Sequence, residues 1–196
     1  MDILKRFKET DALLDGHFML SSGLHSPKYL QCALALQHPA DAEKFGKAIA
    51  ERFVGTGNDS DRVTTDFDTV ASPAIGGLII GFATAHALGN RFIWAERENG
   101  VMTVRRGFTV EPGERILVVE DVITTGGSTR ECIAALEANG GNVVAAASII
   151  DRSNGAADVG VPRISLVSLD VPSYRPDECP LCADGIKAIK PGSRKS

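Results

Sequence analysis

The chain has 196 residues, 43% of them hydrophobic, and a formal net charge of −4. This length and composition suffice for one α/β domain with a full core, and the negative charge argues against a nucleic-acid-binding protein, which would usually be basic. Four cysteines and a charged N-terminus without an apolar run indicate reduced thiols in a cytoplasmic protein. The longest weakly apolar run, residues 75–89, is too short to span a bilayer, so no membrane segment is expected.

The first third of the chain predicts two helices separated by extended segments. Apolar anchors in residues 2–14 indicate a short helix, and residues 17–31 hold two short extended pieces. Pro39 begins a second helix, which Gly55 is expected to end. A polar loop follows at residues 55–61.

Beyond this loop, predicted strands and helices alternate. Strands are expected at residues 69–71, 91–94, 116–119, 143–150 and 164–169, with helices at 78–88 and 128–139. The alternation predicts an α/β fold with a mainly parallel twisted sheet flanked by helices. In such sheets ligands bind outside the carboxyl ends of the strands, so the loops that follow the strands are candidate site segments.

The most informative segment begins at Ile116 and ends at Thr129. A buried apolar strand is followed by Glu120 and Asp121 and then by the small residues of a Thr-Thr-Gly-Gly-Ser loop. Glycine lets backbone N–H groups approach an anion closely, and a helix start adds the positive end of its dipole. Ser128 and Glu131 match a capping box, which predicts that the helix begins there.

The acidic pair distinguishes this loop from other phosphate-binding loops. No lysine follows Gly127, as a Walker loop requires, and the GxGxxG fingerprint is missing. Ionised carboxylates only accept hydrogen bonds. Glu120 and Asp121 would therefore repel phosphate but bind two sugar hydroxyls or support Mg²⁺. The segment predicts a ligand with an anionic group at one end and a diol or metal at the other, against the alternative of a solvated acidic pair beside an ordinary turn.

Several segments resemble one enzyme family. Residues 120–129 resemble the phosphoribosyl pyrophosphate (PRPP) signature of type I phosphoribosyltransferases. The Ser-Gly-x-x-Ser-Pro segment at 22–27 and the strand end Asp151-Arg152 resemble the orotate phosphoribosyltransferase family, and the segment from Cys179 onward resembles its short-loop, Thermus-type branch. The resemblance implies the type I phosphoribosyltransferase fold, as a single domain over residues 1–196. Its core would span about 36–170, with a small hood from about 1–35 and 171–190.

The resemblance also implies an activity. Members of this family transfer the 5-phosphoribosyl group from PRPP to orotate, which yields orotidine 5′-phosphate and pyrophosphate in de novo pyrimidine (UMP) biosynthesis. The implied cofactor is Mg²⁺, the small-molecule substrates are PRPP and orotate, and the implied assembly is a homodimer. Two alternatives remain open: a type I phosphoribosyltransferase for another base, such as a purine or uracil, and a PRPP-sensing regulator without turnover.

The same resemblance assigns roles to individual residues. The implied catalytic residues are Arg97, Glu120 and Asp121. PRPP is expected to bind Arg97 and the signature residues Glu120, Asp121, Val122, Ile123, Thr124, Thr125, Gly126, Gly127 and Ser128. Orotate is expected to contact Thr124, Arg152 and His25. The implied pyrophosphate loop consists of Ser72, Pro73, Ala74, Ile75 and Gly76, and Mg²⁺ is expected to bind through PRPP near Glu120 and Asp121.

The chain departs from the family pattern at three places. Gly76 stands where many orotate enzymes carry a lysine. The lid that begins near Arg97 is short and contains neither lysine nor histidine, and Arg105 and Arg106, which follow it, are about as well explained as solvated surface residues. His25 replaces a common lysine, and it either donates to a base oxygen or is a plain exposed histidine.

Cys179 and Cys182 form a Cys-x-x-Cys pair near the C-terminus. One such pair supplies two metal ligands, whereas a structural zinc needs four. The other cysteines, Cys32 and Cys132, are isolated in the sequence. A tight turn is therefore the favoured interpretation, and a zinc shared across a dimer is the alternative.

Overall fold

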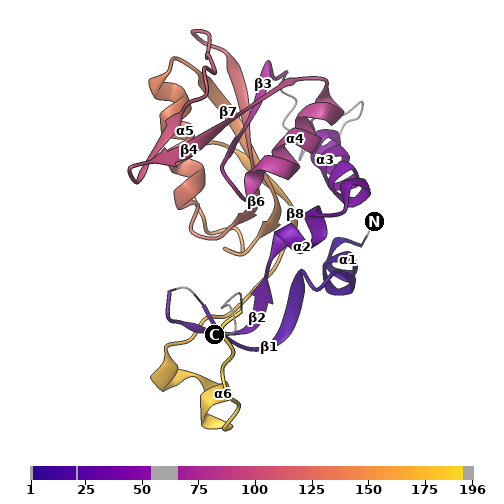
Figure 1. Cartoon of the computed structure of the whole chain (residues 1–196), viewed down its shortest axis with the longest axis vertical. Helices are drawn as coiled ribbons and strands as arrows, with labels where there is room; N and C mark the ends of the chain where they lie inside the picture. The colour runs from indigo at the N-terminus through magenta and orange to yellow at the C-terminus, as the bar shows by residue number, and fades with distance from the viewer. Residues whose placement is uncertain (1, 21, 54–65, 192–196) are drawn as a thin grey trace. The chain divides into compact units, whose positions relative to one another are not determined.

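The computed structural model describes residues 2–20, 22–53 and 66–191 (Figure 1). The chain divides into two compact units. The smaller unit combines residues 1–35 with 170–196, and the larger unit comprises residues 36–169.

The larger unit contains a six-stranded sheet with the order β5-β4-β3-β6-β7-β8. All neighbouring strands are parallel except β4 and β5, which form an antiparallel hairpin. The elements in chain order are α3 (Pro39–Phe53), β3 (Thr69–Pro73), α4 (Gly77–Leu88), β4 (Arg91–Glu98), β5 (Val101–Val104), β6 (Arg115–Ile123), α5 (Gly127–Ala138), β7 (Asn142–Asp151) and β8 (Arg163–Ser168). The predicted fold class is confirmed.

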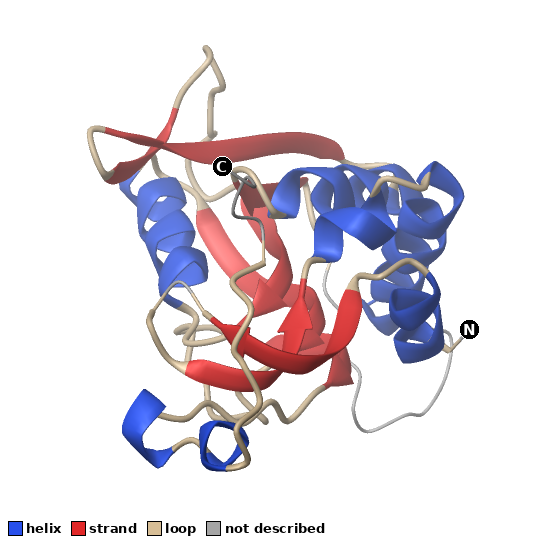
Figure 2. Cartoon of the chain, turned by 60° about the horizontal axis from the view of Figure 1, so that its bottom comes forward, coloured by secondary structure: helices blue, strands red, loops and turns tan. Residues whose placement is uncertain are grey.

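Helices cover both faces of this sheet. Figure 2 shows α5 on one side of the central strands of this sheet and helices of the α3–α4 pair on the other, and α4 packs on β3 and β6. Strand β6 is apolar on both faces, as a central parallel strand must be. Ile116 and Val118 join the core beneath Cys132 and Leu136 of α5.

The strand order places a topological switch at the centre of the sheet. From β3 the chain moves outward to β4 and β5, and it then returns to β6 and continues to β7 and β8 on the other side. The connections from β3 and β6 therefore leave in opposite directions. This leaves a crevice at their carboxyl ends, which is where open α/β sheets bind ligands.

The smaller unit is built on a two-stranded hairpin. Its elements are α1 (Ile3–Glu9), β1 (Leu13–Met19), β2 (His25–Leu30), the 3₁₀ helix η1 (Pro176–Glu178) and α6 (Pro180–Ala183), and α2 (Cys32–Leu36) leads into the larger unit. Bridges between Phe18 and Ile189 and between His25 and Tyr174 join the C-terminal segment to the hairpin.

Some predicted boundaries are wrong. The first helix ends at Glu9 rather than at residue 14, because the Thr10 hydroxyl donates to the Arg6 carbonyl and Asp11 adopts a positive φ of 56°. Strand β6 continues through the acidic pair, and α2 was not predicted. The expected stop at Gly55 and the loop at 55–61 lie outside the described residues. Within the described part of the chain, no helix combines the length and apolar character needed to cross a membrane.

Candidate active site at the carboxyl ends of strands β3 and β6

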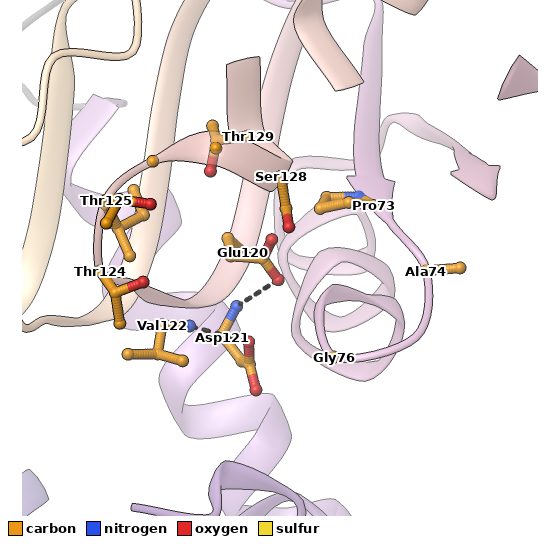
Figure 3. Close-up of a pocket in the computed structure, with 13 residues that line it drawn as sticks. Pro73, Ala74, Gly76, Glu120, Asp121, Val122, Thr124, Thr125, Ser128 and Thr129 are labelled. Atoms are coloured by element: carbon orange, nitrogen blue, oxygen red, sulfur yellow. Dashed lines mark hydrogen bonds between the residues drawn. The ribbon is translucent and has the colours of Figure 1, made fainter. Parts of the chain in front are cut away.

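A cavity of about 280 Å³ opens at the switch between β3 and β6 (Figure 3). Figure 3 shows the acidic pair between two loops, one that leads from β6 into α5 and one that leads from β3 into α4. The lining comprises Pro73, Ala74, Gly76, Glu120, Asp121, Val122, Ile123, Thr124, Thr125, Gly126, Gly127, Ser128 and Thr129. The structure thus brings the whole predicted signature together with three residues of the predicted pyrophosphate loop.

The loop between β6 and α5 presents backbone donors to this cavity. Gly126 caps α5 in a left-handed conformation with φ 74°, which favours glycine, and the helix begins at Gly127. The first N–H groups of a helix have no intrahelical acceptor, so they remain available to an anion. The predicted capping box is wrong, because no side chain caps this helix and the carboxylate of Glu131 pairs with Arg97 instead.

Glu120 and Asp121 lie at the end of β6, where Glu120 is only 7% exposed. The backbone N–H of Asp121 donates to Glu120 Oε1 at 3.3 Å, and that of Val122 donates to Asp121 Oδ1 at 2.8 Å. Burial, followed by the neighbouring Asp121 carboxylate, raises the pKa of Glu120 to about 9. Burial and the Asp121 carboxylate thus both favour the protonated form of Glu120 over the ionised form.

The loop after β3 passes very close to the acidic pair. A Cβ placed on Gly76 would lie 2.8 Å from Asp121 Oδ1, and one on Gly77 would lie 2.8 Å from the Val119 carbonyl oxygen. No side chain fits at Gly76 unless Asp121 moves, which gives a packing reason for the absence of the family lysine.

The remaining residues of the predicted pyrophosphate loop do not line the cavity. The Ser72 hydroxyl donates to the Val119 carbonyl at 2.7 Å and so ties β3 to β6, and Ile75 is 82% exposed. Ala74 does line the cavity, but its backbone N–H donates to the Ala95 carbonyl at 2.7 Å, and the Ala74–Ile75 peptide bond is cis.

The predicted arginines of the β4–β5 region lie in ion pairs outside the cavity lining. Arg97 pairs with Glu131 of α5 and donates to the Gly100 carbonyl at 2.8 Å. Arg106 binds both carboxylate oxygens of Glu96, at 3.0 and 2.9 Å, which holds the pKa of Glu96 below its ordinary value. Arg105 lies 3.1 Å from Glu98.

Asp151 is the last residue of β7, where it pairs with Ile123 of β6, and Arg152 follows it. The backbone N–H of Arg152 donates to the Ile123 carbonyl at 2.8 Å. The partner of Asp151 is Arg163, whose guanidinium lies 3.1 Å from Asp151 Oδ2. Although burial opposes the charge on Asp151, hydrogen bonds from Ser153, Gly155 and Arg163 hold its pKa below the usual range.

His25 belongs to the smaller unit, where it is 5% exposed. The interpretation of a plain exposed histidine is therefore wrong. Its Nδ1 lies 2.9 Å from His17 Nε2 and 3.3 Å from the sulfur of Cys182. Sequence reasoning missed His17 altogether, and the only signal of this cluster was the Cys-x-x-Cys pair.

Comparison with known proteins identifies the family. Residues 40–171 match the phosphoribosyl transferase domain. The chain is 53% identical to an orotate phosphoribosyltransferase of Pelotomaculum thermopropionicum, over 99% of this chain and 97% of that protein. The chain belongs to the orotate phosphoribosyltransferase family. A second orotate phosphoribosyltransferase, from Carboxydothermus hydrogenoformans, is 49% identical over 100% of this chain and 98% of its own length.

Solved structures of family members share this fold. The orotate phosphoribosyltransferase of Aeropyrum pernix superposes with a TM-score of 0.67 at 27% identity, over 84% of this chain and 92% of that chain. The Mycobacterium tuberculosis enzyme in complex with PRPP gives a TM-score of 0.63 at 25% identity, over 84% and 94% of the two chains. The predicted type I phosphoribosyltransferase fold is thereby confirmed.

Proposed function

We propose that this enzyme transfers the 5-phosphoribosyl group from PRPP to orotate and so forms orotidine 5′-phosphate and pyrophosphate for UMP biosynthesis. The observation that carries the proposal is the cavity at the β3–β6 switch. There a helix start with free N–H groups faces an acidic pair, and a second, side-chain-poor loop closes the opposite side. The names and high identity of the full-length relatives support the same reaction.

Three parts of the cavity suit the three parts of PRPP. The 5-phosphate would accept hydrogen bonds from the backbone N–H groups and hydroxyls of the Thr124–Ser128 loop. The ribose hydroxyls would donate to Glu120 and Asp121, and the loop at 73–76 would offer the pyrophosphate the backbone N–H groups of residues 75 and 76, since Pro73 has none and that of Ala74 is bonded to Ala95. Arg97 would contribute a cation to the same ligand after exchanging Glu131 for a phosphate oxygen.

Catalysis by these residues is a matter of positioning and electrostatics. Breaking the bond between C1 and pyrophosphate leaves positive charge on the ribose and negative charge on the leaving group. The acidic pair would stabilise the positive charge on the ribose, and the backbone donors would stabilise the negative charge on the pyrophosphate. Orotate is the nitrogen nucleophile, so no covalent intermediate with the enzyme is required.

The donor set also fits Mg²⁺, the proposed cofactor. Two adjacent carboxylates supply hard oxygen ligands, and their mutual repulsion, which contributes to the raised pKa of Glu120, would be relieved by a divalent cation. When bound through PRPP, Mg²⁺ neutralises charge on the pyrophosphate.

Orotate selection is assigned to Thr124, Arg152 and His25. Arg152 follows β7 directly beside the signature loop, where a guanidinium can bind the carboxylate that distinguishes orotate from uracil. Thr124 lines the cavity. The proposed base contact of His25 has the least support, because the ring nitrogen Nδ1 already faces His17 and Cys182.

One assay tests the proposal against its alternatives. Pyrophosphate release from PRPP and Mg²⁺ is measured with orotate, uracil, hypoxanthine and adenine in turn. We expect release with orotate alone. Release with a purine and none with orotate would contradict the base assignment, and PRPP binding without release for any base would favour a regulator.

Replacement of Arg152 tests the carboxylate contact. Arg152→Ala should raise the KM for orotate about 10- to 100-fold, because a charge-assisted hydrogen bond contributes about 1.5–3 kcal/mol. The KM for PRPP should change far less. Arg152→Lys keeps the charge but loses the two-point geometry, so it should recover part of the affinity. Equal effects on both KM values would contradict the assignment.

We also propose a homodimer and a cytoplasmic location. The first accords with an exposed apolar stripe on α4, formed by Ile79 and Phe82. The cytoplasmic location accords with the four cysteines, none of which forms a disulfide, because a reducing compartment keeps cysteines unpaired.

A further inference from the structure

Four side chains with metal-binding atoms converge in the smaller unit. His17 lies in β1, His25 in β2, Cys179 precedes α6 and Cys182 lies within it. One ligand atom from each residue lies within 4.8 Å of all the others. His17, His25 and Cys179 are buried, with exposed fractions of 3%, 5% and 3%, whereas Cys182 is exposed.

The distances between these atoms approach those of a tetrahedral zinc site. Zinc binds histidine nitrogen at about 2.0–2.1 Å and cysteine sulfur at about 2.3 Å, so a tetrahedron places two nitrogens about 3.3 Å apart and a nitrogen and a sulfur about 3.6 Å apart. Here the two ring nitrogens are 2.9 Å apart. The sulfur of Cys179 lies 3.5 Å from His17 Nε2, and that of Cys182 lies 3.9 Å from His17 Nε2 and 3.3 Å from His25 Nδ1.

The surroundings of His17 orient its ring for coordination. His17 Nδ1 lies 2.6 Å from the Ile186 carbonyl oxygen, which can only accept a hydrogen bond. Nδ1 therefore carries the ring proton, and the lone pair of Nε2 points into the cluster. Metal-bound histidines are commonly held by such a bond from the second ring nitrogen to a carbonyl.

We propose that His17, His25, Cys179 and Cys182 bind one structural Zn²⁺. Two thiolates and two imidazoles form a soft nitrogen–sulfur donor set that suits zinc and not Mg²⁺ or Ca²⁺. Four protein ligands complete the tetrahedron, so the ion has no open position for a substrate. Binding displaces the two thiol protons to solvent.

A metal at this site would join two segments of the smaller unit that are far apart in the chain. It would link the β1–β2 hairpin to the C-terminal segment, which pairs with the hairpin in two isolated β-bridges, at Phe18–Ile189 and His25–Tyr174. A unit of this size buries little apolar surface, and small units commonly depend on a metal or disulfides for stability. The zinc would therefore hold together the unit that the family resemblance identifies as the hood.

Metal content and spectroscopy test this proposal on the full-length, untagged protein. Protein purified from zinc-supplemented medium should contain about one zinc per chain. After the zinc is removed with a chelator, added Co²⁺ should produce the strong visible absorption of tetrahedral thiolate coordination. Reloading with Zn²⁺ should raise the thermal unfolding midpoint.

Matched variants separate this site from adventitious binding. Cys182→Ser and His17→Gln should each lower zinc affinity at least about tenfold. His86→Gln replaces an exposed histidine of α4, and Cys132→Ala replaces a cysteine of the larger unit; both should retain full zinc content.

The proposal fails if wild-type protein binds neither Zn²⁺ nor Co²⁺ stoichiometrically, or if Cys182→Ser retains the wild-type affinity. A Cys179–Cys182 disulfide in protein purified under reducing conditions, detected by mass, would also overturn it. The Co²⁺ titration uses the wild-type protein, so it decides the question even if a variant fails to fold. None of these readouts depends on orotate turnover.

Discussion

Gly76 shows how a single missing side chain shapes the site. Its backbone is helical, with φ −57° and ψ −44°, so any residue can adopt its conformation. The constraint is the Asp121 carboxylate, 2.8 Å from the position of a Cβ. Gly76→Ala should therefore destabilise the protein by about 1–3 kcal/mol, as overpacking usually does. Urea unfolding measures the change.

A double-mutant cycle isolates the cause of this effect. In an Asp121→Ala background the opposing carboxylate is gone, so Gly76→Ala should change the free energy of unfolding by less than about 0.5 kcal/mol. A cost that stays the same in both backgrounds would show that the loop backbone, and not Asp121, excludes the side chain.

Glu120 makes stability depend on pH. Its pKa rises from 4.5 to about 9 on folding, so over this interval the folded state holds a proton that the unfolded state has lost. This contribution is fully present below pH 4.5 and is lost as the pH rises toward 9, by at most about 1.4 kcal/mol per pH unit. In Mg²⁺-free buffer, Glu120→Gln should flatten that decline.

The control for this measurement is Glu137→Gln, which alters an exposed carboxylate of α5. Urea unfolding at several pH values should give the control the same pH dependence as wild type. Parallel curves for Glu120→Gln and wild type would mean that Glu120 is ionised throughout, contrary to the burial argument.

At the scale of elements, an ion pair between Arg97 and Glu131 joins β4 to α5. Both side chains are 46% exposed, so loss of the pair should change the free energy of unfolding by less than about 1 kcal/mol. The two variants should differ in catalysis. Arg97→Gln should lower kcat/KM for PRPP at least about tenfold, because it removes the proposed phosphate-binding cation. Glu131→Gln should leave kcat/KM within about threefold of wild type.

Steady-state kinetics on the two variants tell binding from positioning. Each substitution breaks the same ion pair, and only one removes the guanidinium. If both lower kcat/KM equally, Arg97 acts by fixing β4 against α5 and does not contact PRPP.

Strand β6, helix α5 and the loop between them show what the sequence could predict about the candidate site. The strand, acidic pair, glycine loop and helix of the candidate site are contiguous, so local patterns predicted their order correctly. The expected bounds, 116–119 and 128–139, differ from the observed strand Arg115–Ile123 and helix Gly127–Ala138. The capping box failed because Gly126 already caps α5 in a left-handed conformation and Glu131 has an arginine partner on β4. That partner comes from tertiary packing, which local patterns do not contain.

Over the whole molecule, the sequence predicted the parallel sheet because its strands are apolar and alternate with helices. It could not predict the His/Cys cluster, whose members His25 and Cys182 are 157 residues apart in the chain. The Cys-x-x-Cys pair comes to lie beside the two histidines because β-bridges hold the C-terminal segment against the hairpin. These bridges form only in the folded chain.

The proposed dimer leads to a prediction about α4 and the loop before it. Ile75, Ile79 and Phe82 follow one another at helical spacing and are 82%, 46% and 64% exposed. Three large apolar side chains in one stripe indicate a surface that a second copy would cover. Phe82→Glu should therefore raise the dimer dissociation constant at least about tenfold, because it places a charge in an apolar interface. Sedimentation equilibrium measures this constant, and Leu34→Glu, at an apolar residue of α2 that is 36% exposed, serves as the control. A wild-type monomer, or a dimer that Phe82→Glu leaves intact, would place any interface elsewhere.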